Sequence, residues 1–298
     1  MSITPNAGRA VWRTAIAGLA VCAAATGLAA CGSDDDSSKA ASGGAATATA
    51  DAGAGTGFKA LDSGKLTVGM NLQFKPEMYL ESGQPAGYDV DVLKKLAPAL
   101  GASLNIKNLD FNGLIPGLQA KQFDLVSVGL TPTDERKQAV DFTRAYVPYA
   151  LVLATNPSKG AGPSTAEDFN KKGKVITALQ GSSGEQLAKK TFSDATVKGF
   201  PDQTAAFLEV ASGRADGIVV EDYHLAQIAA SNKGKLEKAP IEKPLDVQYG
   251  SWAVPKGNDE FVKYLDTWLC KAQTDGTLES IYKQDFKVDE FPPMPEGC

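Results

Sequence analysis

The chain has 298 residues, enough for about two average domains, and its 43% hydrophobic and 22% charged residues are ordinary for a soluble globular protein. Thirty basic and 35 acidic side chains give a net charge of −5, which argues against a nucleic-acid-binding protein. A single histidine and four scattered cysteines argue against a histidine-based metal site, a zinc module or a disulfide-dense scaffold, so we expect no metal and no cofactor.

The N-terminal region has the pattern of a targeting signal. Residues 1–13 contain two arginines and no acid, and about 16 apolar or small residues follow, fewer than the roughly 20 of a membrane span. This pattern is typical of a secretory signal peptide, here residues 1–30. It ends in Leu28-Ala29-Ala30-Cys31-Gly32, which resembles the bacterial lipoprotein cleavage box, so Cys31 is the expected lipidation site. The alternative is a plain signal peptide with an incidental cysteine.

Residues 31–57 predict a lipid anchor and a disordered tether. Almost all of residues 32–57 are Gly, Ala, Ser, Thr or Asp, without the apolar periodicity that a core requires. A flexible chain of this length spans roughly 30 Å on average. We therefore expect a folded body outside the cytoplasm, attached to the cell membrane through the lipid anchor only.

The folded region contains the same βαβαβ pattern twice, which predicts α/β lobes with mostly parallel sheets flanked by helices. In the first copy we expect strands at residues 65–69, 104–106 and 123–128, and helices at 89–100 and 114–120. In the second copy we expect strands at residues 174–179, 195–200 and 213–220, and helices at 182–190 and 203–212.

Two extended apolar runs, residues 149–155 and 249–255, are expected to cross between the lobes as hinge strands. Helices are expected after the second crossing, at residues 258–273 and 277–282. The predicted organisation is therefore lobe 1 from residues 58–152 and 251–298, and lobe 2 from residues 153–250.

Two turns that follow strands carry groups suited to an anion. In Gln180-Gly181-Ser182-Ser183-Gly184-Glu185, Ser182 and Glu185 fit a capping box, and small residues leave amide groups that can hold a carboxylate. In Thr131-Pro132-Thr133-Asp134-Glu135-Arg136, Thr133 is expected to cap a helical turn, which would put Arg136 near the carboxyl edge of the sheet. Arginine matches a carboxylate with two parallel hydrogen bonds. An ordinary capped helix and a surface arginine are the alternatives.

The groups suited to a cation and to an apolar stem follow other strands. Glu221 and Asp222 come just past the end of a buried strand, where an acid can meet an ammonium group or simply cap a helix. Phe74 and Phe111 are in loops beyond strands, where an aromatic ring can pack on the aliphatic part of a ligand, although a lone phenylalanine is usually a core residue.

Several short motifs occur in order from about residue 66 to residue 285. They are Gly87-Tyr88-Asp89-Val90-Asp91, Phe111-Asn112-Gly113-Leu114-Ile115-Pro116-Gly117-Leu118, Asp124, Thr131-x-Thr133-x-x-Arg136, Asp141-Phe142-Thr143, Gln180-Gly181-Ser182, Gly213-Arg214-x-Asp216 and Asp275-Gly276-Thr277. Together they resemble the bacterial extracellular solute-binding proteins of family 3, which bind polar amino acids for ABC importers. The resemblance implies a two-lobed periplasmic-binding-protein type II fold with two hinge strands, and a monomeric, non-enzymatic receptor that works with an ABC transporter permease.

The resemblance also implies roles for individual residues. Arg136 would clamp the α-carboxylate of the ligand, helped by the backbone N–H groups of Thr131 and Ser183. The Gly129 carbonyl, the Thr131 hydroxyl and Glu221 would hold the α-ammonium. Phe74 and Phe111 would sandwich the side chain of the ligand, and Val128 would form an apolar wall beside it. Asn71 and Leu179 would face the far end of that side chain.

This chain departs from the family pattern in two places. The family usually has Asp at the position of Glu221, so Asp222 remains a rival contact for the ammonium. The aromatic-x-Pro-aromatic segment of the family is Phe74-Lys75-Pro76-Glu77-Met78 here, which leaves the pocket floor open. Asn71 is neutral, which favours a neutral polar amino acid such as glutamine over lysine or arginine.

Two alternatives to the receptor use the same scaffold. One is a periplasmic enzyme, such as a dehydratase or a cell-wall lytic enzyme. The other is a sensor module, which would need a membrane span and a cytoplasmic part. His224, the one histidine, is expected on a surface helix rather than beside a nucleophile.

The C-terminal helix predicts a disulfide. Phe261, Leu265, Trp268 and Ala272 form one apolar face, and Cys270 lies about 180° from Phe261 at 100° per residue. Because an exposed thiol outside the cell tends to oxidise, we expect a Cys270–Cys298 disulfide. Two free cysteines are the alternative.

Overall fold

The computed structural model describes residue 61, residues 64–159, residues 165–295 and residue 298. These residues belong to one compact unit, Ala50–Cys298. The predicted signal peptide, the lipidation site at Cys31 and the tether lie outside the described residues. Within the described part of the chain, no helix is long and apolar enough to cross a membrane.

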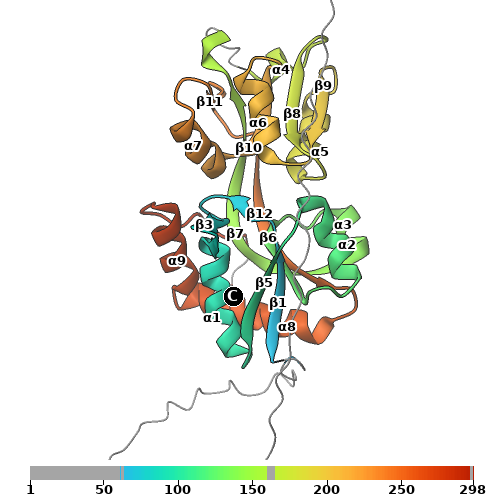
Figure 1. Cartoon of the computed structure of the whole chain (residues 1–298), viewed down its shortest axis with the longest axis vertical. Helices are drawn as coiled ribbons and strands as arrows, with labels where there is room; N and C mark the ends of the chain where they lie inside the picture. The colour runs from blue at the N-terminus through green and yellow to red at the C-terminus, as the bar shows by residue number, and fades with distance from the viewer. Residues whose placement is uncertain (1–60, 62–63, 160–164, 296–297) are drawn as a thin grey trace, which may run out of the picture. The chain divides into compact units, whose positions relative to one another are not determined.

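The first lobe is an α/β layer structure around a parallel sheet (Figure 1). Its elements before the crossing are β1 (Lys65–Met70), α1 (Tyr88–Ala99), β5 (Ser103–Asn108), the 3₁₀ turn Phe111–Gly113, α2 (Leu114–Gln119), β6 (Leu125–Leu130) and α3 (Asp134–Ala139). After the return crossing come α8 (Asp259–Thr274) and α9 (Thr277–Phe286). Strand β1 pairs in parallel with β5 on one side and β6 on the other, which confirms the first predicted βαβαβ unit.

The second lobe repeats this arrangement. Its elements are the 3₁₀ turn Pro157–Lys159, α4 (Ala166–Phe169), β8 (Val175–Leu179), α5 (Ser183–Thr191), β9 (Thr196–Phe200), α6 (Gln203–Ala211), β10 (Gly217–Glu221), α7 (Asp222–Ser231) and β11 (Glu237–Lys238). Strand β8 pairs in parallel with β9 and β10, so the order β9-β8-β10 matches β5-β1-β6 of the first lobe.

Two long antiparallel strands join the lobes (Figure 1). They are β7 (Val140–Thr155) and β12 (Asp246–Pro255), and both predicted extended runs lie inside them. Val147 packs in the core of the first lobe, whereas Tyr149, Leu151 and Val152 pack in the clusters of the second. The lobe boundaries predicted at residues 152 and 250 both lie within these two strands.

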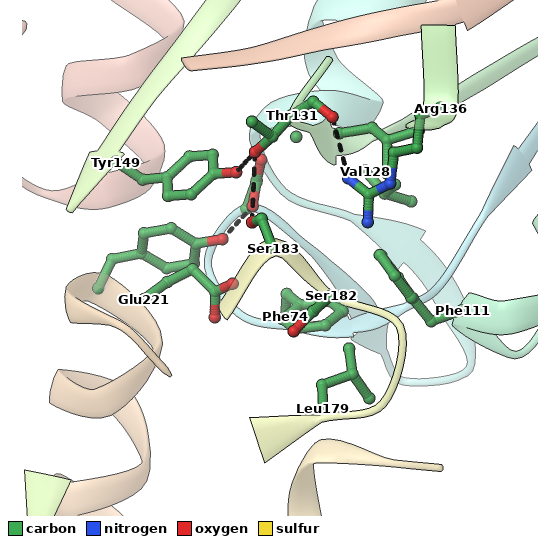
Figure 2. A pocket seen from close by; sticks show the side chains of 14 residues that line it. Phe74, Phe111, Val128, Thr131, Arg136, Tyr149, Leu179, Ser182, Ser183 and Glu221 are labelled. Atoms are coloured by element: carbon green, nitrogen blue, oxygen red, sulfur yellow. Dashed lines mark hydrogen bonds between the residues drawn. The ribbon is translucent and has the colours of Figure 1, made fainter. Parts of the chain in front are cut away.

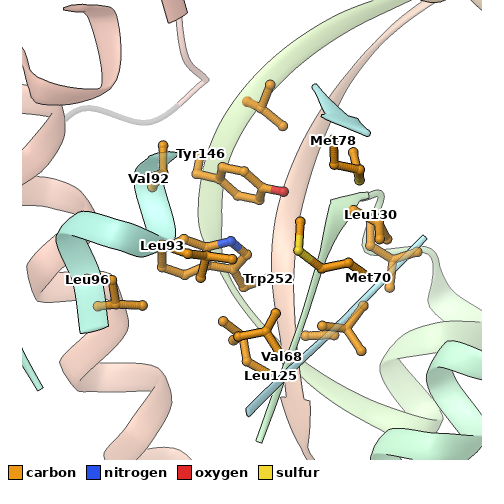
Figure 3. Close-up of a cluster of buried hydrophobic side chains, with 14 of the residues drawn as sticks. Val68, Met70, Met78, Val92, Leu93, Leu96, Leu125, Leu130, Tyr146 and Trp252 are labelled. Atoms are coloured by element: carbon orange, nitrogen blue, oxygen red, sulfur yellow. The ribbon is translucent and has the colours of Figure 1, made fainter. Parts of the chain in front are cut away.

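The core of the first lobe is a cluster of buried hydrophobic side chains that includes Tyr146 and Trp252 (Figure 3), and these two residues also take part in a buried polar network. Trp252 donates its indole N–H to the Ser127 hydroxyl at 2.9 Å, and the hydroxyls of Ser127 and Tyr146 both donate to Asp89 Oδ2 at 2.6 Å. Asp89 is fully buried at the start of α1, where its charge also faces the positive end of the helix dipole. The core of the first lobe thus holds a buried carboxyl group that accepts two hydroxyl hydrogen bonds.

A three-stranded sheet precedes α1, and the sequence patterns did not predict it. It comprises β2 (Gln73–Phe74), β3 (Met78–Glu81) and β4 (Gln84–Ala86). Gly87 has φ 105°, and a Cβ atom there would lie 2.4 Å from the Pro76 carbonyl oxygen, so only glycine permits this approach. The close contact holds the turn that carries Glu77 against the beginning of α1.

The structure bears on the expectations for His224 and for the two C-terminal cysteines. His224 is 2% exposed, so the expectation of a surface position is wrong: its ring packs edge-on against Phe74 and Phe207 at centroid distances of 5.1 and 5.5 Å. Cys270 and Cys298 are free thiols in the structure, with the Cys298 Sγ 3.3 Å from the Cys270 carbonyl oxygen. The disulfide therefore stays a prediction.

Candidate functional site

A cavity of about 370 Å³, counted with its open mouth, lies between the carboxyl ends of the parallel strands of both lobes (Figure 2). The cavity is lined by Phe74, Glu77, Phe111, Val128, Gly129, Leu130, Thr131, Arg136, Tyr149, Leu179, Ser182, Ser183, Glu221 and Tyr223.

The structure brings nine of the ten predicted ligand-binding residues to this cavity. They are Phe74, Phe111, Val128, Gly129, Thr131, Arg136, Leu179, Ser183 and Glu221. Asn71 is the exception, since its amide donates to the Leu109 carbonyl at 2.7 Å and its Oδ1 accepts from the Gln73 amide. The preference for a neutral ligand that we inferred from Asn71 therefore loses its structural basis.

Arg136 occupies one end of the cavity and is held rigidly there. Thr133 caps α3 by accepting the Arg136 backbone N–H at 3.3 Å, as predicted. The guanidinium donates to the carbonyl oxygens of Thr131 at 3.0 Å and of Gly181 at 2.9 Å, and it stands over the Phe111 ring at 5.6 Å. Burial lowers the pKa of Arg136, but arginine remains charged, so this end presents a fixed cation.

The turn before α5 belongs to the second lobe and closes the same end. Ser182 caps the helix by accepting the Glu185 N–H at 3.0 Å, while Glu185 reaches back to the N–H of Gly181 at 2.8 Å. The predicted capping box is thus present with its second bond shifted by one residue. The Gly181 carbonyl accepts a hydrogen bond from the Arg136 guanidinium, so this turn of the second lobe is linked directly to the first lobe. We call this end of the cavity the anion end, because its fixed cation would hold the carboxylate of a ligand.

Glu221 lies on the opposite side of the cavity from Arg136 (Figure 2). Its Oε2 atom is buried and has no hydrogen-bond partner among the described residues. Burial raises the pKa of Glu221 to about 7. Its rival Asp222 is absent from the cavity lining and accepts the Tyr223 backbone N–H at 2.8 Å. Of the two acids, only Glu221 is placed to meet a ligand cation.

The Thr131 hydroxyl lies between the two ends and is shared among several polar groups. It is hydrogen-bonded to the Tyr149 hydroxyl, to Gln248 Oε1 at 2.9 Å and to the Ser183 hydroxyl at 3.4 Å. Since Ser183 comes from the second lobe and Gln248 from a hinge strand, this one side chain connects three parts of the fold.

Glu77, Tyr149 and Tyr223 are charged or polar lining residues that the sequence did not assign to the site. The Tyr223 hydroxyl donates to Glu77 Oε2, which links the second lobe to the first. The available signal was the departure from the family pattern at Glu77, where an acid replaces an aromatic residue. Tyr149 lies in a hinge strand and Tyr223 in helix α7, and no motif of the sequence analysis included either residue.

The fold and the cavity define the class of type II periplasmic binding proteins, in which two similar lobes joined by two strands enclose a solute. The profile of the bacterial extracellular solute-binding proteins, family 3, matches residues 66–288. The chain belongs to this family.

Comparisons with individual proteins agree with this assignment. The chain is 30% identical over 224 residues to the arginine-binding extracellular protein ArtP of Bacillus subtilis, covering 74% of this chain and 86% of that protein. It is 27% identical to a cyclohexadienyl dehydratase of Pseudomonas aeruginosa, covering 73% and 81%. The solved structure of an ancestral arginine-binding protein bound to glutamine superposes with a TM-score of 0.69 at 32% identity, covering 76% and 99%.

Proposed function

We propose that the protein is an extracytoplasmic receptor that captures a free amino acid between its lobes and delivers it to the permease of an ABC importer. The observation that carries the proposal is the placement of Arg136 and Glu221 on opposite sides of one cavity. An amino acid is a zwitterion, and these two side chains match its two charges. The family membership and the amino-acid-binding relatives support the same conclusion.

The proposed binding mode couples capture to closure. Arg136 belongs to the first lobe, whereas Ser183 and Glu221 belong to the second. A ligand held by Arg136 at its carboxylate and by Glu221, the Gly129 carbonyl and Thr131 at its ammonium would bridge the lobes. Such a ligand makes more contacts with the closed form than with an open one, so binding shifts the population toward closure.

Calorimetric titration of residues 50–298 with each of the common amino acids tests the proposal. This segment includes all described residues and forms one compact unit. We expect saturable heat at a stoichiometry of one for at least one amino acid. Absence of binding for the whole panel would contradict the receptor function.

The side chain of the ligand meets an apolar section of the cavity. Phe74, Phe111, Val128 and Leu179 form it, and aromatic rings on both sides suit an aliphatic or planar stem. Glutamine, which the neutral Asn71 favoured, stays a candidate that the panel includes.

A second candidate function is a dehydratase-like enzyme on the same scaffold. Glu221 favours it, because a buried carboxyl group with a pKa of about 7 suits a general acid near neutral pH. The dehydratase relative adds weight to this alternative. Analysis of the titrated mixtures by mass spectrometry separates the two functions, since a receptor returns its ligand unchanged and an enzyme converts it.

We further propose that Cys31 carries the lipid that attaches the protein to the outer face of the cell membrane. The support is the Leu28-Ala29-Ala30-Cys31-Gly32 segment after a basic and then apolar leader. Mass spectrometry of the native N-terminus should find a lipidated cysteine at this position. Release of a Cys31→Ser variant into the medium, with Cys22→Ser remaining attached or processed as the wild type, would support the assignment.

The Cys270–Cys298 disulfide is proposed for the same extracytoplasmic setting. The Sγ atom of Cys298 lies beside the backbone of Cys270, which makes bridging a local rearrangement of the tail. Thiol labelling without reductant should leave both cysteines unmodified in protein purified from cells. Labelling of both would show that the bridge does not form.

A further inference from the structure

The end of the cavity that would hold the cationic group of a ligand, here called the cation end, contains a second carboxylate besides Glu221. Glu77 lies in the turn between β2 and β3, is 1% exposed and lines the cavity. A Cβ atom on Gly129 would be 2.4 Å from Glu77 Oε1, so this oxygen lies directly against the Gly129 backbone. It has no hydrogen-bond partner among the described residues, although the Tyr223 hydroxyl donates to the other oxygen, Oε2.

The charges lining the described cavity do not balance. Arg136 supplies one positive charge, and Glu77 and Glu221 supply two negative charges when both are ionised. The guanidinium donates to two backbone carbonyls and to neither carboxylate. A bound zwitterion adds no net charge, so it would leave one buried negative charge uncompensated, which is strongly unfavourable.

We propose that Glu77 is a specificity-determining residue that, together with Glu221, selects amino acids carrying a net positive charge. The inference rests on the proposed receptor function and names the ligand class of the same site. A ligand with one carboxylate and two cationic groups brings the charge of the closed cavity to zero. One cationic group meets Glu221 at the α-position, and the second compensates Glu77.

The surroundings of Glu77 determine what a neutral ligand must do instead. Asp89 faces Glu77 from α1, Tyr149 from β7, Glu221 from β10 and Tyr223 from α7. The buried tyrosines Tyr88 of α1, Tyr146 of β7 and Tyr282 of α9 also face Glu77. Burial and the nearby Asp89 charge raise the pKa of Glu77 well above its usual range, while the Tyr223 hydrogen bond lowers it. A neutral amino acid can therefore bind with a proton on one of the two glutamates.

This proton produces a difference in pH dependence between two kinds of ligand. A neutral amino acid binds together with one proton, which is held by Glu77 or Glu221. Once the pH exceeds the pKa at which this pair of glutamates loses the proton, the dissociation constant of a neutral amino acid should therefore rise by about tenfold per pH unit. A cationic amino acid requires both glutamates to be ionised, so its affinity should increase with pH and then level off.

The test measures dissociation constants of L-lysine, L-arginine, L-ornithine and L-glutamine between pH 6 and pH 9, using residues 50–298. The wild type should prefer the tightest cationic amino acid over glutamine by about tenfold or more at high pH. Glu77→Gln should lower that preference by about tenfold and remove the weakening of glutamine binding at high pH. Glu81→Gln is the matched control, since Glu81 is an exposed acid of the neighbouring strand β3.

A second variant keeps Glu77 and changes only its proton affinity. Tyr223→Phe removes the hydroxyl that stabilises the ionised carboxylate, so the pH at which glutamine binding weakens should move upward. An upward shift supports the proposal even if Glu77→Gln does not fold.

Three results would overturn the proposal. Glutamine binding as tightly as the cationic amino acids, with no dependence on pH, would overturn the ligand class while leaving the receptor function intact. A preference for cationic ligands that survives Glu77→Gln in folded protein would show that Glu77 does not determine it. Failure of every amino acid to bind would remove both this inference and the receptor function on which it rests.

Discussion

The two ends of the cavity are built on opposite principles. At the anion end, Arg136 is fixed by two hydrogen bonds to backbone carbonyl oxygens, of Thr131 in its own lobe and of Gly181 in the other. At the cation end, Glu77 Oε1 and Glu221 Oε2 are buried without hydrogen-bond partners among the described residues. One end is oriented by protein contacts, and the other has carboxylate oxygens that a ligand can satisfy.

This difference separates two properties of a receptor. A preoriented cation contributes affinity for any ligand that has a carboxylate, because little conformational freedom is lost on binding. Buried carboxylates that lack partners make binding depend on what the ligand supplies in return, because an unsatisfied buried charge is costly. We therefore expect changes at the anion end to weaken all ligands alike and changes at the cation end to alter selectivity.

The largest effect is expected for Arg136→Ala, which removes the fixed cation of the anion end. The loss of the bidentate clamp should weaken binding of every amino acid that binds by roughly 3–5 kcal/mol, a factor of more than a hundred. Titration calorimetry measures it directly. Arg214→Ala is the matched control, because Arg214 is an exposed arginine paired with Glu209 on the surface of the second lobe. An unchanged affinity in Arg136→Ala would contradict the assigned site.

Phe74, which lines the cavity, packs against the buried, neutral His224, so acid should destabilise the folded protein. Burial lowers the pKa of His224 to about 4, whereas an unfolded histidine titrates near 6.5. Between these values the unfolded chain binds a proton that the folded chain does not, so stability falls as the pH falls from about 6.5 toward 4. At pH 4.5 this single group should cost roughly 2 kcal/mol relative to neutral pH.

The measurement is urea unfolding of the wild type and of His224→Gln at pH 7 and pH 4.5. Glu221 and Asp89 also titrate in this range, with pKa values raised to about 7 by burial, but both proteins contain them. The difference between the two proteins therefore isolates His224. If the wild type loses no more stability than the variant on acidification, His224 is not held neutral behind Phe74.

A smaller loss is expected for Glu221→Gln at the cation end. Replacing a charge-assisted hydrogen bond to the ligand ammonium by a neutral one should reduce affinity by about 2 kcal/mol. Asp222→Asn is the control that the chain itself provides, since Asp222 is the next residue and lies outside the cavity lining. Equal losses in the two variants would mean that Asp222, and not Glu221 alone, reaches the ammonium.

The sequence predicted the parts of the molecule that depend on local patterns. Strands β1, β6, β8 and β10 consist mainly of buried residues, most of them apolar, and the Thr133 and Ser182 caps act within three residues of themselves. The position of Arg136 follows from such a cap and from its place after β6. Similar reasoning located Ser183 and Glu221, because each follows a buried strand directly.

The remaining features depend on contacts between segments far apart in the chain. His224 is buried because Phe74 of the first lobe packs against it, and Asn71 is turned from the cavity because Leu109 accepts its amide. Glu77 is drawn into the cavity because Gly87 lets its turn approach the start of α1. Composition and periodicity carry no information about such pairings, so the position of Glu77 at the cation end could not be predicted from them.

The smallest effect is expected for Ser183→Ala, which probes the contribution of the second lobe to the anion end. The Ser183 hydroxyl is 3.4 Å from the Thr131 hydroxyl, a long contact between neutral groups, whereas the ligand carboxylate would use the Ser183 backbone N–H, which alanine keeps. The variant should therefore lose about 1 kcal/mol of affinity, equally for cationic and neutral amino acids, as measured by calorimetry. A loss as large as that of Arg136→Ala would place the main anion contact on the Ser183 side chain. A change in the cationic-to-neutral ratio would mean that the two ends of the cavity are not independent.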